Sequence, residues 1–109
     1  MADISYSVRA SQMLDNILEQ MEAESACDDI DMDMVDGVLK IVFEDGGQII
    51  VNRQEPLEQL WVASHLGPAH FSFDTERNLW IDAKNGSTLM ETLSQALTLK
   101  LGETVTLRD

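Results

Sequence analysis

The chain has 109 residues, of which 44% are hydrophobic, and its formal net charge is −13. This length and composition predict a single folded domain, residues 1–109, whose core needs neither a disulfide nor a structural metal. So negative a chain repels nucleic acid and anionic membranes, which leaves cations and basic protein surfaces as the expected partners.

The first expected element is an amphipathic helix over residues 6–24. Apolar side chains recur at spacings of three and four residues between Ala10 and Met21, which makes one apolar stripe. Asp15, Glu19 and Glu22 share another face of the same helix. The sequence therefore predicts a helix with one buried face and one acidic face.

The next part of the chain alternates between apolar and polar side chains, which is typical of strands. Asp36-Gly37 and Asp45-Gly46-Gly47 predict tight turns, and Gly67-Pro68 predicts a further turn. The expected strands cover residues 30–34, 38–43, 48–52, 57–64, 69–74 and 78–82.

A second helix is expected near the end of the chain. Thr88 and Glu91 form a capping box at its start, and Gly102 stands where it should stop. Residues 103–109 either run back along the core or fray. The element order predicts an α+β fold, a two-layer αβ sandwich with the N- and C-terminal helices packed on one face of an antiparallel sheet. The other sheet face is open to partners.

Acidic residues are concentrated in the first third of the chain. Residues 1–36 hold ten acids and one base, whereas the other 73 residues hold ten acids and six bases. The ten are Asp3, Asp15, Glu19, Glu22, Glu24, Asp28, Asp29, Asp31, Asp33 and Asp36. Like charges at i, i+4 cost a helix roughly 0.2–0.5 kcal/mol, and acids at its C-terminal end cost roughly 0.3–1 kcal/mol each. Acids in positions that destabilise the helix indicate that this surface has a function. The alternative is a solvated acidic face that only aids solubility.

Carboxylates without imidazole or thiolate partners are hard oxygen ligands, which suit Ca²⁺, Mg²⁺, Mn²⁺, Fe²⁺ and Fe³⁺. Residues 28–36 lack the glycine and glutamate spacing of an EF-hand loop. We therefore expect weak, exposed sites completed by water, on a surface that also suits a basic protein. The carboxylates around Cys27 are expected to raise the pKa of its thiol, which makes it a poor nucleophile.

No enzymatic activity is expected, because the sequence lacks the common phosphate-loop, nucleophile-elbow, zinc-protease and paired-cysteine motifs. His65 is interpreted as a loop residue. His70 is expected on the exposed face of a strand, where it could give a metal one imidazole ligand. Cys27 is the only cysteine. A single cysteine excludes an internal disulfide, which fits a reducing compartment. The sequence also shows no leader pattern and no apolar run near the ~20 residues that span a membrane, so a cytoplasmic location is predicted.

The stretch Asn52–Ala63 is the most distinctive in the sequence. Leu60 and Val62 alternate with Trp61, so if they face the core, Trp61 faces solvent beside Arg53 and the amide side chains. An exposed tryptophan in such surroundings suits a protein-contact hot spot. The alternative places Trp61 in the core.

The same stretch resembles the sheet signature of the frataxin family, most closely its bacterial members. The Asn-Arg-Gln-Glu-Pro run at residues 52–56 is the most specific part. The resemblance covers nearly the whole chain, including the acidic first helix and the aspartate-rich first strand. It continues through Gly37-Val38-Leu39, Phe43-Glu44-Asp45-Gly46, Ile49-Ile50-Val51, His70-Phe71, Trp80-Ile81 and Gly102-Glu103-Thr104.

This resemblance implies the αβ sandwich, iron binding through an acidic ridge and a role in iron–sulfur cluster assembly. The implied partners are the cysteine desulfurase and the iron–sulfur scaffold protein, and the implied role is iron donor, desulfurase regulator, or both. Carried over by position, the metal-binding ridge is Asp15, Glu19, Glu22, Asp28, Asp29, Asp31 and Asp33. The partner-binding residues on the sheet are Asn52, Gln54 and Trp61. Ala23, Ser25 and Ala26 depart from the family pattern, so the number and order of metal sites are not carried over.

The sequence leaves three candidate functions. The first is an iron-binding adaptor, with weakly held Fe²⁺ or Fe³⁺ and room for other divalent or trivalent cations. The second is a metal-independent regulator whose ridge is only a protein interface. The third, an iron-oxidising or iron-storing enzyme, ranks last because neither expected helix carries the histidine of a di-iron site. A monomer is expected, with metal-induced oligomers as the alternative.

Overall fold

The computed structural model describes residues 5–109. Asp3 and the start of the N-terminal segment, where no leader is predicted, therefore lie outside the described residues. The helices are α1 (Tyr6–Ala23), η1 (Ser25–Cys27), η2 (Glu55–Leu57) and α2 (Leu89–Leu101). The strands are β1 (Asp31–Val35), β2 (Val38–Val42), β3 (Gln48–Gln54), β4 (Gln59–Ser64), β5 (Gly67–Asp74) and β6 (Leu79–Ile81). None of the helices within residues 5–109 is long and apolar enough to cross a membrane.

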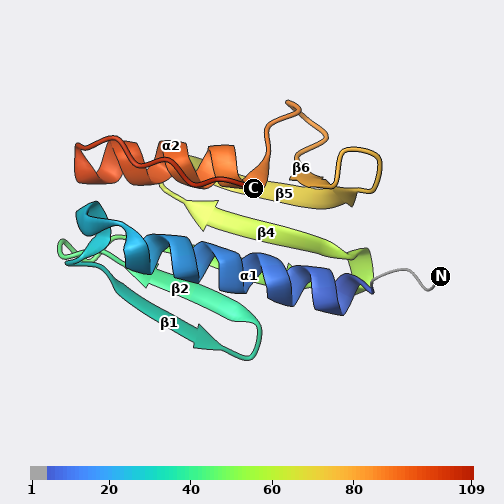
Figure 1. Ribbon diagram of the computed structural model, residues 1–109, viewed down its shortest axis with the longest axis horizontal. Helices are drawn as coiled ribbons and strands as arrows, with labels where there is room; N and C mark the ends of the chain where they lie inside the picture. The colour runs from blue at the N-terminus through green and yellow to red at the C-terminus, as the bar shows by residue number, and fades with distance from the viewer. Residues whose placement is uncertain (1–4) are drawn as a thin grey trace.

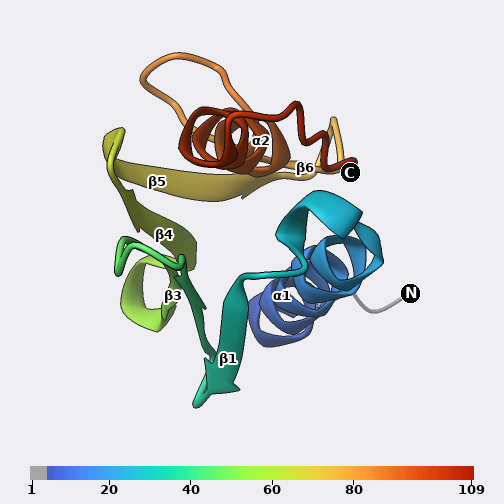
Figure 2. The same ribbon diagram turned by 90° about the vertical axis from the view of Figure 1, so that its left-hand side faces the viewer.

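The strands form one antiparallel sheet in the order β1-β2-β3-β4-β5-β6, so each strand pairs with its neighbours in sequence. Figure 1 shows α1 in front of this sheet. Figure 2 shows α1 facing β1, and α2 beside β5 and β6. This arrangement confirms the α+β sandwich predicted from the element order.

A single hydrophobic core joins the helices to one face of the sheet. α1 contributes a buried stripe at helical spacing, and alternate residues of each central strand meet it. The largest buried side chains of the sheet are Trp80 and Phe71. Truncating a fully buried leucine such as Leu14 to alanine would cost about 2–5 kcal/mol.

The C-terminal segment runs back along this core, which decides between the two alternatives left by the sequence. Val105 and Leu107 are buried. The amide of Val105 donates to Thr98 Oγ1 over 2.9 Å. Gln20 of α1 makes two hydrogen bonds with the backbone of Arg108, accepting at 2.8 Å and donating at 2.6 Å.

Two predicted boundaries in the middle of the sheet are wrong. The strand expected to begin at Leu57 begins at Gln59, because Pro56 lies in the 3₁₀ turn η2 and Glu58 adopts a left-handed conformation with φ +53°. Gly67 and Pro68, expected to form a turn, are the first residues of β5, and Gly67 pairs with Ser64. The other boundaries shift by one or two residues. The capping box at Thr88 and the stop at Gly102 are confirmed.

Candidate functional site: an acidic ridge and an aromatic sheet face

Three acids of the predicted ridge lie on one flank of α1. Because α1 turns its apolar stripe toward the sheet, Asp15, Glu19 and Glu22 are left exposed. At 100° per residue they fall within an arc of roughly 60°. The helix therefore presents a narrow line of carboxylates rather than a ring of scattered charge.

The other four ridge acids follow in the chain. Asp28 and Asp29 are exposed in the turn between η1 and β1. Asp31 and Asp33 are exposed on β1, because Met32 and Met34 pack against the core from the opposite face of the strand. All seven predicted ridge residues are thus solvent-accessible, in a path from α1 through the η1 turn to the edge strand.

The geometry of the ridge is open. Among the described residues, no three histidine, cysteine or acidic side chains converge on a point where they could enclose a metal ion. An ion on this surface would therefore be held by one or two carboxylates and would keep most of its water. Such coordination suits hard cations bound weakly and exchanging quickly.

A lysine beside the ridge is not predicted by the local sequence pattern. Lys40 of β2 pairs directly with Asp33 of β1, and both side chains are exposed on the same sheet face. Cross-strand neighbours of this kind are about 5 Å apart at Cβ. The alternation in β2 places Lys40 outward, but only the strand register places it next to Asp33.

Cys27 is buried beside the ridge. Burial raises the pKa of its thiol, and the Glu24 and Asp28 carboxylates raise it further. The direction predicted from sequence is confirmed, although burial rather than neighbouring charge is the larger cause.

The predicted partner-binding residues share the outer face of the sheet, away from the helices. Asn52 pairs with Trp61, and Gln54 pairs with Gln59. Leu60 and Val62 are buried, which confirms the interpretation that they face the core and excludes the alternative for Trp61. Trp61 is half-buried on the outer face.

Trp61 is held in place by neighbours that the sequence pattern does not single out as a group. Its ring stacks on His70, with centroids 4.0 Å apart and planes 14° apart. Its Nε1 donates to Gln59 Oε1 over 2.8 Å, and Gln59 Nε2 donates to Ser72 Oγ over 3.1 Å. The exposed position expected for His70 is confirmed, and His65 lies in the β4–β5 turn as expected.

The expectation that Arg53 lies beside Trp61 is wrong. Arg53 falls between Asn52 and Gln54 on β3, so the pleat turns its side chain to the opposite face, toward α1. Its guanidinium donates to Ser7 Oγ over 2.8 Å and to Ser11 Oγ over 3.3 Å. Gly37 makes room for this side chain, because a Cβ on that residue would lie 2.7 Å from Arg53 Cδ. Arg53 therefore fastens α1 to the sheet.

Known proteins resemble this chain in sequence and in fold. Residues 1–103 match the family model of the frataxin-like domain. The chain belongs to the frataxin family. The iron-sulfur cluster assembly protein CyaY of Thioalkalivibrio sulfidiphilus is 48% identical over 107 residues, covering 98% of this chain and 100% of that protein.

Solved frataxin structures share the fold. Frataxin from Psychromonas ingrahamii matches with a TM-score of 0.84 and 30% identity, over 95% of each chain. Trimeric frataxin from the yeast Saccharomyces cerevisiae, in a ferrous complex, matches with a TM-score of 0.68 and 26% identity, over 94% of this chain and 90% of that one. The resemblance read from residues 52–63 is thereby confirmed.

In this member of the frataxin family, the two exposed acids of β1, Asp31 and Asp33, lie on the same face of the sheet as the stacked pair Trp61 and His70. The register aligns Val35, Val38, Asn52, Trp61 and His70 in one row across five strands. The next row begins with Asp33 and Lys40. A partner lying across the sheet would therefore touch the end of the acidic ridge and the Trp61–His70 stack together.

Proposed function

We propose that this chain is an iron-binding protein of iron–sulfur cluster assembly, which acts as iron donor, as regulator of the cysteine desulfurase, or as both, through its acidic ridge. The observation that carries the proposal is the line of seven exposed carboxylates on α1, the η1 turn and β1 in a frataxin-family chain. The name of the 48% identical relative supports the pathway, and the ferrous complex of yeast frataxin supports the metal.

Metal binding would be shared along the ridge. The proposed ligands are Asp15, Glu19, Glu22, Asp28, Asp29, Asp31 and Asp33. Oxygen-only ligands favour Fe²⁺ or Fe³⁺ and admit other divalent or trivalent cations. Because each ion keeps much of its water, release to an acceptor needs little rearrangement, which suits a carrier better than a store.

Partner binding would use two parts of the surface. Basic residues of the desulfurase would meet the ridge carboxylates, and the scaffold protein would contact Asn52, Gln54 and Trp61. The Trp61–His70 stack supports the second contact, because an aromatic side chain already fixed in one orientation loses little entropy on binding.

In this proposal the chain is a cytoplasmic, non-enzymatic, single-domain monomer over residues 1–109. The trimeric yeast relative supports oligomers as the alternative, with metal as the proposed inducer.

Neutralising the strand end of the ridge tests the proposal. The variant Asp29→Asn/Asp31→Asn/Asp33→Asn should weaken both Fe²⁺ binding and desulfurase binding, measured by calorimetry at moderate salt without oxygen. The matched control Glu55→Gln/Glu58→Gln/Glu76→Gln removes the same charge from exposed positions off the ridge and should change neither affinity. Desulfurase affinity retained in the ridge variant would contradict the proposal.

A metal-independent regulator is the second candidate, and the open geometry of the ridge favours it. Within residues 5–109 no cluster of ligating side chains is preformed for a metal, yet a row of exposed carboxylates needs no such cluster to dock a basic surface. A desulfurase assay with the purified chain, with and without Fe²⁺, separates the two. A response that is the same in both conditions supports the metal-independent role.

A further inference from the structure

The loop between β6 and α2, residues 82–88, contains a chemically labile pair, Asn85 and Gly86. It is the only Asn-Gly pair in the sequence, because the other asparagines precede isoleucine, arginine and leucine. Both residues are exposed, and Gly86 has a left-handed backbone conformation with φ +76°. Because glycine has no Cβ, little shields its backbone nitrogen from the side chain of the asparagine before it.

The reaction open to this pair is deamidation of Asn85. The backbone nitrogen of Gly86 attacks Asn85 Cγ and loses its proton, the bond from Cγ to Nδ2 breaks, and ammonia leaves. Water then opens the resulting five-membered succinimide at either of its two carbonyl carbons. One opening gives aspartate, and the other gives isoaspartate, in which the backbone runs through the former side chain. The co-reactant is water, and no electrons are transferred.

Hydrogen bonds restrain both reacting groups while the loop is closed. The Gly86 amide donates to the carbonyl oxygen of Asp82 over 2.8 Å. Asn85 Oδ1 accepts from the Ser87 amide over 2.9 Å. The first bond must break before the nitrogen can lose its proton and attack, and the second restricts rotation of the side chain toward that nitrogen. The closed loop is therefore protected, and the reaction requires an open one.

Asp82 holds the loop closed. Its side chain is buried, and its Oδ1 accepts from the Lys84 amide over 2.9 Å. Its own amide donates to the Ser87 carbonyl over 2.9 Å, and Ile81 forms a β-bridge with Thr88 beyond it. Residues 83–86 of the loop are exposed, so opening breaks a few hydrogen bonds and leaves the apolar core in place. Local opening of this kind is easier than global unfolding.

We propose that Asn85 is a site of spontaneous deamidation whose rate is set by opening of the β6–α2 loop. The aspartate product keeps the loop, because its carboxylate accepts from the Ser87 amide as the amide oxygen does. The isoaspartate product lengthens the backbone and disrupts the hydrogen bonds at Asp82. Either product adds a negative charge to a chain whose net charge is already −13. The site is independent of the proposed role in iron binding.

Incubation of the metal-free full chain in native buffer and in guanidinium chloride, at the same mildly alkaline pH, tests the proposal. Peptide mapping by mass spectrometry follows the replacement of NH by O at each asparagine, and enzymatic methylation detects isoaspartate. Conversion is expected at Asn85 in both conditions. It should be roughly tenfold or more slower in the folded chain, because the denaturant removes the hydrogen bonds that restrain the loop.

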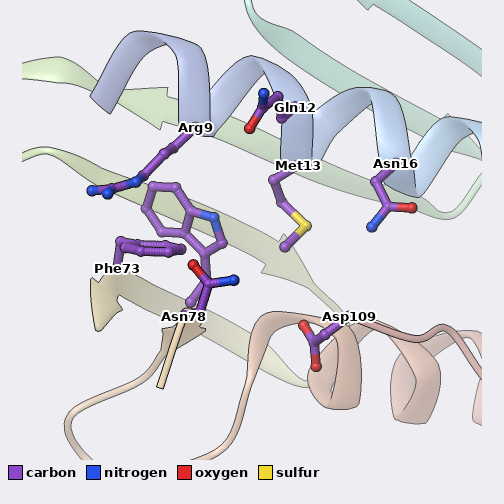
Figure 3. Close-up of a pocket in the computed structure, with 8 residues that line it drawn as sticks. Arg9, Gln12, Met13, Asn16, Phe73, Asn78 and Asp109 are labelled. Atoms are coloured by element: carbon purple, nitrogen blue, oxygen red, sulfur yellow. The ribbon is translucent and has the colours of Figure 1, made fainter. Parts of the chain in front are cut away.

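Asn78 is the internal control for exposure. It is exposed in the β5–β6 turn, as Asn85 is in its loop, but it precedes Leu79 instead of a glycine. Figure 3 shows Asn78 at the cavity between α1 and the β5–β6 hairpin. Because the Leu79 side chain hinders the same ring closure, Asn78 should convert much more slowly than Asn85 in both conditions.

Two variants test the control by the loop. Asp82→Ala removes the acceptor of the Lys84 amide and should speed native conversion by roughly 3- to 10-fold, the effect of one hydrogen bond, without changing the denatured rate. The matched control Asp74→Ala removes an equivalent acceptor from the β5–β6 turn and should leave both rates unchanged. Circular dichroism checks that both variants fold, and the comparison of native with denatured rates in the unaltered chain needs neither variant.

The inference is overturned by any of three results. The first is a folded chain in which Asn85 does not convert. The second is a folded chain in which Asn85 converts as fast as in guanidinium chloride, because the closed loop would then give no protection. The third is an equal effect of Asp82→Ala and Asp74→Ala on the native rate, because opening of the β6–α2 loop would then not control the reaction.

Discussion

Lys40 shows how one residue can set the local affinity of the ridge. It lies directly opposite Asp33 and contributes the positive charge nearest to that carboxylate on the sheet face. A divalent cation held by Asp31 and Asp33 would be repelled by it, at a cost of about 1 kcal/mol in water if the ammonium and the cation are about 8 Å apart.

Replacing Lys40 with methionine should therefore tighten divalent-cation binding at the strand end of the ridge by roughly 3- to 10-fold at low salt. Titration of Mn²⁺ followed by paramagnetic relaxation of the β1 amides measures this change. The control Lys84→Met removes the same charge from the loop between β6 and α2 and should have little effect. Equal effects of the two variants would assign the change to net charge rather than to position.

Cys27 tests the balance between burial and charge. Burial is the main reason that the pKa of its thiol is raised, so the thiolate is scarce at neutral pH and the sulfur is also shielded. Alkylation by iodoacetamide near pH 8 should be much slower in the folded chain than in urea. Glu24→Gln should accelerate it only slightly, because the Glu24 carboxylate is the smaller cause. Acceleration to the rate in urea would mean that charge, not burial, protects Cys27.

At the residue scale, the sequence predicts which side chains face outward but not which ones meet. The alternation of Leu60 and Val62 is enough to place Trp61 on the outer face. The same alternation, applied to Asn52 and Gln54, turns Arg53 inward, and grouping Arg53 with Trp61 by proximity in sequence is the error. The contact between Trp61 and His70 depends on the register of β4 against β5, which has no local sequence signal.

At the scale of the element, α1 is built against its own electrostatics. Its last turn has no basic residue, and Glu22 lies near the end where the helix dipole is already negative. α2 shows the opposite arrangement, with Glu91 in its first turn and Lys100 in its last. The contrast between the two helices supports a use for the α1 acids other than stability.

Single neutralisations in the two helices should accordingly change stability in opposite directions. Glu22→Gln should raise the free energy of unfolding by about 0.3–1 kcal/mol at low salt, because it removes a charge from the wrong end of α1. Glu91→Gln should lower it by about 0.3–1 kcal/mol, because it removes a negative charge from the first turn of α2, where the helix dipole favours one, while the glutamine oxygen still accepts from the Thr88 amide in the capping box. Urea unfolding without metal measures both. A loss of stability in Glu22→Gln would contradict the claim that the ridge is placed against helix energetics.

Elements with local signals are the ones that the sequence predicts. The start of α2 at Thr88, its end at Gly102 and the hairpin turn at Asp36-Gly37 all depend on residues within one turn of each other. The C-terminal segment is different, because its position depends on hydrogen bonds between Gln20 and Arg108, which are 88 residues apart. No pattern within residues 103–109 indicates that contact.

For the whole molecule, the net charge of −13 predicts a stability that depends on cations. If the ridge carboxylates repel one another, a divalent cation that binds them stabilises the folded state beyond simple screening. At ten times its Kd, one such ion adds about 1.4 kcal/mol, or roughly 5–10 °C in the Tm of a domain this size. Thermal unfolding in MgCl₂ or CaCl₂ should therefore give a higher Tm than NaCl of equal ionic strength. Equal Tm values would favour a merely solvated acidic face.

The most direct test of the central claim, that the ridge is the iron-binding surface, is an anaerobic titration of the ¹⁵N-labelled chain with Fe²⁺. Paramagnetic broadening should appear first at the amides of the ridge, from Asp15 through the η1 turn to Asp33. The amides of β6 and of Trp61 should be spared. Broadening that begins at His70, or that spreads evenly over the exposed acids of the whole chain, would contradict the account.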